Sequence, residues 1–129
     1  MTDKQFETVR LDALVSRFFK ARTSPILGWN GIRWLTWTPL EKYWFGLYPP
    51  GRTGSPNTDH LYLLRIDSRR SGTGFRYATD PEELLLWAKI KMSQERKLDT
   101  DLVKACRNGD DEKATQLAAQ RFLRYPITA

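Results

Sequence analysis

The chain has 129 residues, with 21 basic and 15 acidic side chains and a formal net charge of +6. This length fits one domain that buries a core without disulfides, and 40% hydrophobic with 28% charged residues argues against wholesale disorder. No apolar run approaches the about 20 residues that a membrane span needs, and the N-terminus lacks the apolar core of a signal peptide. We therefore expect a cytoplasmic protein that does not enter a membrane.

The chain has one cysteine, Cys106, and one histidine, His60. A disulfide within the chain is therefore excluded, and so is a structural zinc site, which needs about four Cys or His ligands. Cys106 lies in an expected helix, where we expect a buried, inert thiol. The sequence predicts neither a metal site nor a cofactor.

The first predicted element is an amphipathic helix over residues 4–22. Its apolar residues recur at helical spacing on one face, and basic residues decorate the other side. Pro25 is expected to end this segment. The apolar stripe consists of Leu11, Leu14, Val15, Phe18 and Ala21.

Residues 31–78 are predicted to form β structure. In "GIRWLTWT", Ile32 and Trp34 alternate with Arg33, Leu35 and Trp37, which is the period of a strand. Three more short strands are expected in "EKYWFGLY", "HLYLLRID" and "FRYAT", separated by the loop "PPGRTGSPNTDH" and the turn "SRRSGTG". Strands joined in this way favour an antiparallel meander.

The remainder of the chain is predicted to be helical. A helix begins at "TDPEELLLWAKIKM", with Thr79 or Asp80 at the N-cap and Pro81 at the first helical position. The polar stretch "SQERKLDT" is interpreted as a connector, followed by two helices on either side of Asn108-Gly109. We therefore predict a single α+β domain over residues 1–129. It has a three- to four-stranded antiparallel sheet at about 31–78, an N-terminal helix and about three C-terminal helices.

Aromatic residues are concentrated between positions 28 and 50, which hold four of the five tryptophans. Strand alternation places these rings on both faces of the sheet, so one buried face cannot hold them all. If helices cover both faces, the rings are core; if one face stays uncovered, its rings are a site for a protein partner or a homodimer. The candidate partner-binding residues are Trp34, Trp37, Trp44 and Tyr48.

Arginines are concentrated further along, where residues 31–80 carry seven basic and four acidic side chains. Two of the arginines project from the tip of the expected hairpin, and another lies in the long loop. Guanidinium groups offer paired donors to phosphate oxygens and to guanine, so we interpret this set as a DNA or RNA contact. The candidate nucleic-acid-binding residues are Arg52, Arg65, Arg69, Arg70 and Arg76.

Enzyme motifs are not found in the sequence. "GRTGS" lacks the spacing and the trailing lysine of a phosphate-binding loop, and "TDH" offers only a short Asp-His fragment. The chain is therefore interpreted as a basic, non-enzymatic nucleic-acid-binding module. Two alternatives stay open: an adaptor or inhibitor of a larger complex that uses an exposed aromatic sheet face, and a small metal-independent ribonuclease.

Overall fold

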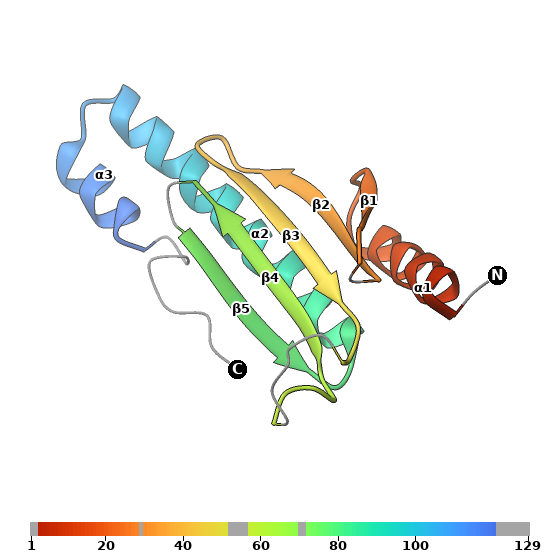
Figure 1. The fold of residues 1–129 in the computed structure, drawn as a ribbon. Helices are drawn as coiled ribbons and strands as arrows, with labels where there is room; N and C mark the ends of the chain where they lie inside the picture. The colour runs from red at the N-terminus through yellow and green to blue at the C-terminus, as the bar shows by residue number, and fades with distance from the viewer. Residues whose placement is uncertain (1–2, 29, 52–56, 70–71, 121–129) are drawn as a thin grey trace.

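The structure is a computed structural model that describes residues 3–28, 30–51, 57–69 and 72–120. In chain order, a helix precedes an antiparallel sheet, and two helices follow it (Figure 1). The elements are α1 (Asp3–Phe18), β1 (Thr23–Ile26), β2 (Gly31–Trp37), β3 (Lys42–Tyr48), β4 (Tyr62–Ser68), β5 (Gly72–Ala78), α2 (Pro81–Arg107) and α3 (Asp111–Ala118).

The sheet has five strands in the order β1-β2-β3-β4-β5, each antiparallel to its neighbour. The α+β class and the antiparallel meander are confirmed, but the strand count exceeds the three to four expected. The additional strand is β1, which is four residues long and contains Pro25. Proline cannot donate to a ladder and is tolerated in an edge strand. Pro25 therefore lies in a strand, and α1 ends earlier, at Phe18.

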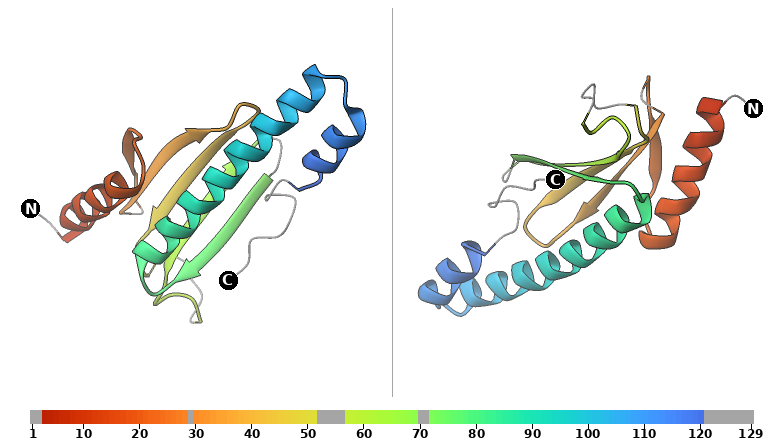
Figure 2. Two further views of the ribbon diagram at one scale, coloured as in Figure 1. Left: turned by 180° about the vertical axis from the view of Figure 1, so that it is seen from behind. Right: turned by 90° about the horizontal axis from the view of Figure 1, so that it is seen from below.

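The described helices lie on one side of the sheet. Figure 2 shows α2 running diagonally across one face, and its right-hand view shows α1 beside the edge formed by β1 and β2. Buried residues of both helices and of one sheet face form a single core. Its fully buried members include Leu11 and Val15 of α1, Trp34, Phe45 and Ile66 of the sheet, and Leu84, Leu85, Ala88 and Met92 of α2.

Aromatic rings form the centre of this core. Trp34 and Phe45 are paired across β2 and β3, and their rings are stacked with centroids 5.4 Å apart. Phe19, which follows α1, packs against both, at centroid distances of 5.3 and 5.9 Å. Burying each such side chain contributes about 1.5–3 kcal/mol, so this cluster fixes α1 against the sheet.

The start of α2 is the part of the fold that the sequence predicted best. The Asp80 carboxylate accepts a hydrogen bond from the backbone N–H of Glu82 at 2.9 Å, and Pro81 occupies the first helical position. Glu82 and Glu83 lie in the first turn, where they complement the positive end of the helix dipole. An N-cap was expected at Thr79 or Asp80, and the structure places it at Asp80.

The connector predicted at residues 93–100 is wrong, because α2 continues through it to Arg107. The stretch was predicted to be a connector because it is polar, but Glu95 and Asp99 are buried against the sheet as part of the helix. Asp99 accepts a hydrogen bond from the Thr38 hydroxyl in the turn between β2 and β3. The stretch contains no glycine or proline to stop a helix.

The chain reverses after α2 at Gly109, whose φ of 70° suits a glycine. Asp110 then caps α3 by accepting from the N–H of Lys113 at 3.2 Å. Two helices therefore follow the sheet in the described part of the chain, where about three were expected. The last predicted helix extended into residues 121–129, which lie outside the described residues. Cys106, expected to be buried, is exposed.

None of the helices among the described residues is both long and apolar enough to cross a membrane.

Candidate functional site

One face of the sheet has no described helix over it, and we call it the open face (Figure 2, right). The register of β2–β5 determines its membership, because side chains alternate between the two faces. Its residues are Arg33, Leu35 and Trp37 of β2; Lys42, Trp44, Gly46 and Tyr48 of β3; Leu63, Arg65 and Asp67 of β4; and Thr73, Phe75 and Tyr77 of β5.

Large rings of the open face are exposed to solvent. Trp37 is 54% exposed, Trp44 45% and Phe75 39%, whereas Trp34 on the other face is fully buried. Exposed rings of this size on neighbouring strands are typical of a binding surface rather than of a core. Strand alternation could not show whether helices cover one or both faces of the sheet. In the described chain they cover one face.

Each of two arginines lies over one of these rings. The Arg33 guanidinium is 5.7 Å from the centroid of Trp44, and that of Arg65 is 5.7 Å from the centroid of Phe75. Arg33, Gly46 and Arg65 are neighbours in one row across β2, β3 and β4, with Phe75 next on β5. Attraction between a cation and a ring holds each guanidinium close to the sheet.

The two arginines differ in their hydrogen bonds. Arg33 donates through Nε to the Ser24 hydroxyl at 3.2 Å, and its terminal nitrogens make no hydrogen bond within the described residues. Arg65 donates through two nitrogens to the Asp67 carboxylate, at 2.8 and 3.3 Å. Arg33 therefore presents more of its donors to a ligand, while Asp67 compensates part of the charge of Arg65.

Gly46 leaves a gap between the two arginines, and the Tyr48 ring lies across it. A Cβ built on Gly46 would be 3.0 Å from the Tyr48 ring, so the absence of a side chain lets the ring lie flat. A cleft of about 250 Å³ follows this gap and is lined by Arg33, Trp44 and Arg65 among others. Burial raises the pKa of the Tyr48 hydroxyl above its usual value of 10.0, against an opposing effect of Arg65.

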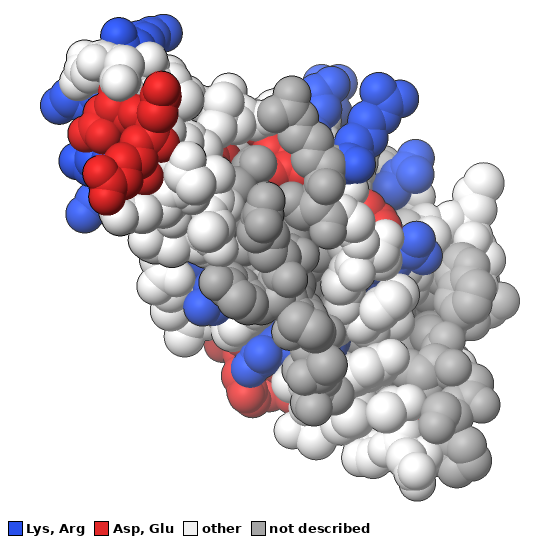
Figure 3. Space-filling model, turned by 90° about the vertical axis from the view of Figure 1, so that its left-hand side faces the viewer, with Lys and Arg blue, Asp and Glu red and all other residues white. Residues whose placement is uncertain are grey.

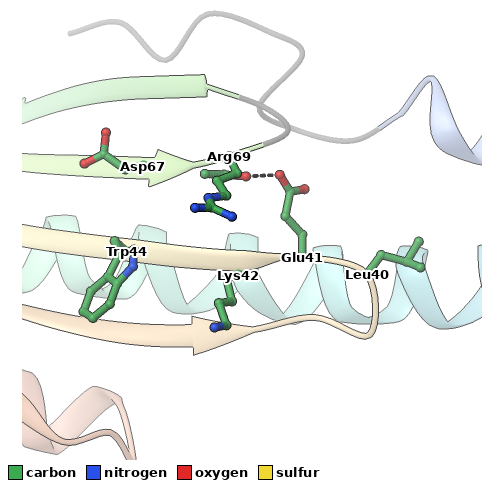
Figure 4. Close-up of a pocket in the computed structure, with 7 residues that line it drawn as sticks. Leu40, Glu41, Lys42, Trp44, Asp67 and Arg69 are labelled. Carbon is green, nitrogen blue, oxygen red and sulfur yellow. Dashed lines mark hydrogen bonds between the residues drawn. The ribbon is translucent and has the colours of Figure 1, made fainter.

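A second cleft, of about 710 Å³, lies at the end of the open face near the β2–β3 turn. Figure 4 shows Lys42 and Trp44 extending from β3, and the Arg69 guanidinium reaching from the end of β4 toward them. Beside them Glu41 accepts hydrogen bonds from the hydroxyls of Ser68 and Tyr43, which fixes its carboxylate in the cleft wall.

The structure brings some of the predicted arginines together and separates others. Arg65 lies on the open face, and Arg69 is exposed at its end. Arg76 pairs with Leu64 in the register and lies on the covered face, with its guanidinium 4.7 Å from the Trp87 centroid of α2. Arg52 and Arg70 lie outside the described residues.

The predicted aromatic residues are divided between the two faces. Trp37, Trp44 and Tyr48 lie on the open face, but Trp34 is a core residue stacked on Phe45. The open-face residues that were not proposed from the sequence include Arg33, Lys42 and Phe75. The alternation in "GIRWLTWT" places Arg33 on the same face as Trp37, so strand periodicity could have identified Arg33 as a site residue.

Charge is distributed unevenly around the molecule. In Figure 3 acidic side chains gather over α3, whose first turn contains Asp111 and Glu112, and Lys and Arg side chains project on the side of the open face. Among the described residues of that face, Arg33, Lys42 and Arg65 outnumber the one carboxylate, that of Asp67. Within the described ranges, no three His, Cys, Asp or Glu side chains are grouped to hold a metal ion.

Comparison of the chain with protein-family models, with curated proteins and with solved structures gives no match. The geometry of the open face is therefore the basis for a functional proposal.

Proposed function

We propose that the open face binds single-stranded nucleic acid without catalysing a reaction on it. One observation carries this proposal: exposed rings and guanidiniums are interleaved on one uncovered sheet face, with Arg33 over Trp44 and Arg65 over Phe75. Rings bind the faces of bases, and guanidiniums bind phosphates, so a surface that alternates them matches the two components of a nucleic-acid strand.

Bases would stack on the exposed rings of the face. Stacking of a base on an aromatic side chain is worth about 1–3 kcal/mol and depends little on sequence. The cleft of about 250 Å³ has the Tyr48 ring, which lies across Gly46, as one wall, and a planar base would stack against this ring. This arrangement favours binding with limited discrimination between sequences.

Phosphates would lie against the basic residues along the same face. Arg33 presents its terminal nitrogens, and Lys42 and Arg69 line the larger cleft at the end of the sheet. Arginine donates two parallel hydrogen bonds to a phosphate, and lysine acts as a point charge. The roles first assigned to Arg52 and Arg70, which lie outside the described residues, remain predictions.

A single strand suits this surface better than a duplex does. In a duplex the bases stack on one another, so their faces are not accessible to Trp44 or Phe75. A broad five-stranded sheet also cannot enter the major groove, which admits a helix or a two-stranded ribbon. The proposal therefore predicts a preference for single strands over duplexes of the same sequence.

Fluorescence anisotropy with labelled DNA and RNA oligonucleotides, at two salt concentrations, tests the proposal. The double variant Arg33→Ala with Arg65→Ala should weaken binding and lower the dependence of affinity on salt, because phosphate contacts are lost. The matched control, Arg17→Ala with Arg107→Ala, removes the same charge from exposed helical positions. Absence of binding at low salt, or equal losses in both variants, would contradict the proposal.

A protein partner is the competing use of the same surface, because Trp, Tyr and Arg are enriched among the residues that dominate interface energies. Sedimentation of the protein alone tests for a homodimer. A dimer that the substitution Trp44→Ala dissociates, together with no oligonucleotide binding, would favour that alternative.

A further inference from the structure

The free edge of β2 has a cleft that the proposed site does not use. β1 pairs with β2 only from Gly31 to Trp34, so residues 35–37 have no strand partner on that side in the described chain. The cleft has a volume of about 360 Å³ and lies where the end of α1, this edge and α2 meet. Figure 1 shows α1 beside β1 and β2, with α2 behind the sheet.

The lining of this cleft is basic and partly aromatic. It contains Lys20, Lys89 and Arg96 together with the exposed Trp37, and none of its lining residues is acidic. Both clefts of the open face, in contrast, include the carboxylate of Asp67. Three cations around one hollow, with no carboxylate among the described residues that line it, favour an anionic ligand.

One of the three basic residues, Arg96, is positioned before a ligand binds. Arg96 donates through Nε to the Trp37 carbonyl oxygen at 3.0 Å and through a terminal nitrogen to the Thr36 hydroxyl at 2.6 Å. These two bonds, one to a backbone carbonyl and one to a side chain of β2, hold the guanidinium at the cleft. Across the described residues, no ion pair involves Lys20, Lys89 or Arg96.

We propose that this cleft, which we call the edge cleft, binds phosphates of a nucleic-acid strand that leaves the open face past Trp37. This inference rests on the proposed function. Continuity supports it: Leu35 and Trp37 belong to the open face by register and also line the edge cleft. A strand that stacks on Trp37 therefore passes directly from one surface to the other.

The edge cleft gives the protein a longer binding site than the open face alone. Single-stranded sites on OB folds, which also bind through a sheet surface, span about 4–16 nucleotides. An oligonucleotide of about 6 nucleotides is expected to occupy the open face only, and one of about 15 nucleotides to reach the edge cleft as well. The length of the oligonucleotide therefore distinguishes binding at the open face from binding at the edge cleft.

The test measures binding of both oligonucleotides over a range of salt concentrations. The variant Lys20→Ala with Lys89→Ala should leave the short oligonucleotide unaffected. For the long one it should weaken binding and reduce the slope of log affinity against log salt by about 1.4, the value for two lost phosphate contacts. The matched control, Lys104→Ala with Lys113→Ala, removes two exposed lysines from α2 and α3.

The outcomes separate this inference from the function on which it rests. If the short oligonucleotide binds and the long one gains nothing, or if the control loses as much as the edge variant, the edge cleft does not bind phosphates. If neither oligonucleotide binds the unchanged protein at low salt, the proposed function itself fails, and this inference fails with it. Thermal unfolding of each variant confirms that the fold is unchanged.

Discussion

The two faces of this sheet carry the same kinds of ring but surround them differently. On the covered face Trp34 and Phe45 stack on each other at 5.4 Å and are sealed by helices. On the open face Trp44 and Phe75 have guanidiniums over them at 5.7 Å and remain exposed. Aromatic content alone therefore does not distinguish a core from a site; the neighbours of each ring do.

The largest expected effect is on stability, when a phenylalanine is replaced by alanine on each face of the sheet in turn. Phe45→Ala should lower the free energy of unfolding by about 3–5 kcal/mol, because it leaves a cavity in the core. Phe75→Ala should lower it by less than about 1 kcal/mol, because that ring is 39% exposed. Urea unfolding measures both changes.

If Phe45→Ala does not fold, Phe45→Leu provides a milder version of the same comparison. Similar losses for the two positions would show that the open face is packed like a core, and the contrast between the faces would be lost.

Two glycines of the sheet differ in what an added side chain would meet: backbone at Gly31 and a side chain at Gly46. A Cβ on Gly31 would lie 2.7 Å from the Leu47 carbonyl oxygen, whereas one on Gly46 would meet the Tyr48 ring, which can move. Gly31→Ala should therefore cost about 1–3 kcal/mol of stability. Gly46→Ala should cost less, but it should weaken oligonucleotide binding because Tyr48 is displaced. Thermal unfolding and anisotropy together check the pair; a Gly46→Ala variant with unchanged affinity would remove Tyr48 from the site.

Asp67 is the carboxylate that opposes the basic residues of the open face. Asp67→Asn removes the negative charge of this side chain and weakens its ion pair with Arg65. The affinity for nucleic acid should therefore rise, by about 1 kcal/mol or less because the pair is exposed. Anisotropy titrations against the unchanged protein measure this gain. Weaker binding would show that Asp67 orients Arg65 rather than competing with the ligand.

The smallest effect concerns the pH dependence of stability. The pKa of Tyr48 is raised above 10.0 in the folded state, chiefly by burial, so the folded protein holds this proton more tightly than the unfolded chain does. The resulting stabilisation is complete below pH 10 and is lost as pH rises through the folded pKa. Between pH 8 and pH 11, Tyr48→Phe should therefore lose less stability than the unchanged protein. Parallel slopes for the two proteins would contradict burial of the hydroxyl.

Much of the fold could be predicted because local signals agreed with it. The alternation of β2, the Asp80 cap and the Gly109 turn each depend on residues close together in the chain. β1 was missed because four residues around Pro25 carry little pattern. The middle of α2 was missed because Glu95 and Asp99 are polar yet buried, which only the tertiary packing determines.

The site was harder to predict than the fold. Arginines 65 and 76 lie close in sequence and looked equivalent, but the register of β4 and β5 places them on opposite faces. Pairing within the β2–β3 hairpin brings Arg33 beside Trp44, and pairing within the β4–β5 hairpin brings Arg65 beside Phe75. Such neighbours depend on the strand register, which composition and charge counts do not contain.

The indole N–H signals of the tryptophans provide the most direct test of the claim that the open face binds single-stranded nucleic acid. The chain has five tryptophans, of which Trp37 and Trp44 lie on the open face, while Trp34 and Trp87 lie on the side of α2. In a nitrogen–proton correlation spectrum titrated with a short single-stranded oligonucleotide, we expect the signals of Trp37 and Trp44 to shift and those of Trp34 and Trp87 to stay. Shifts confined to Trp34 and Trp87, or no shift at low salt, would contradict the account.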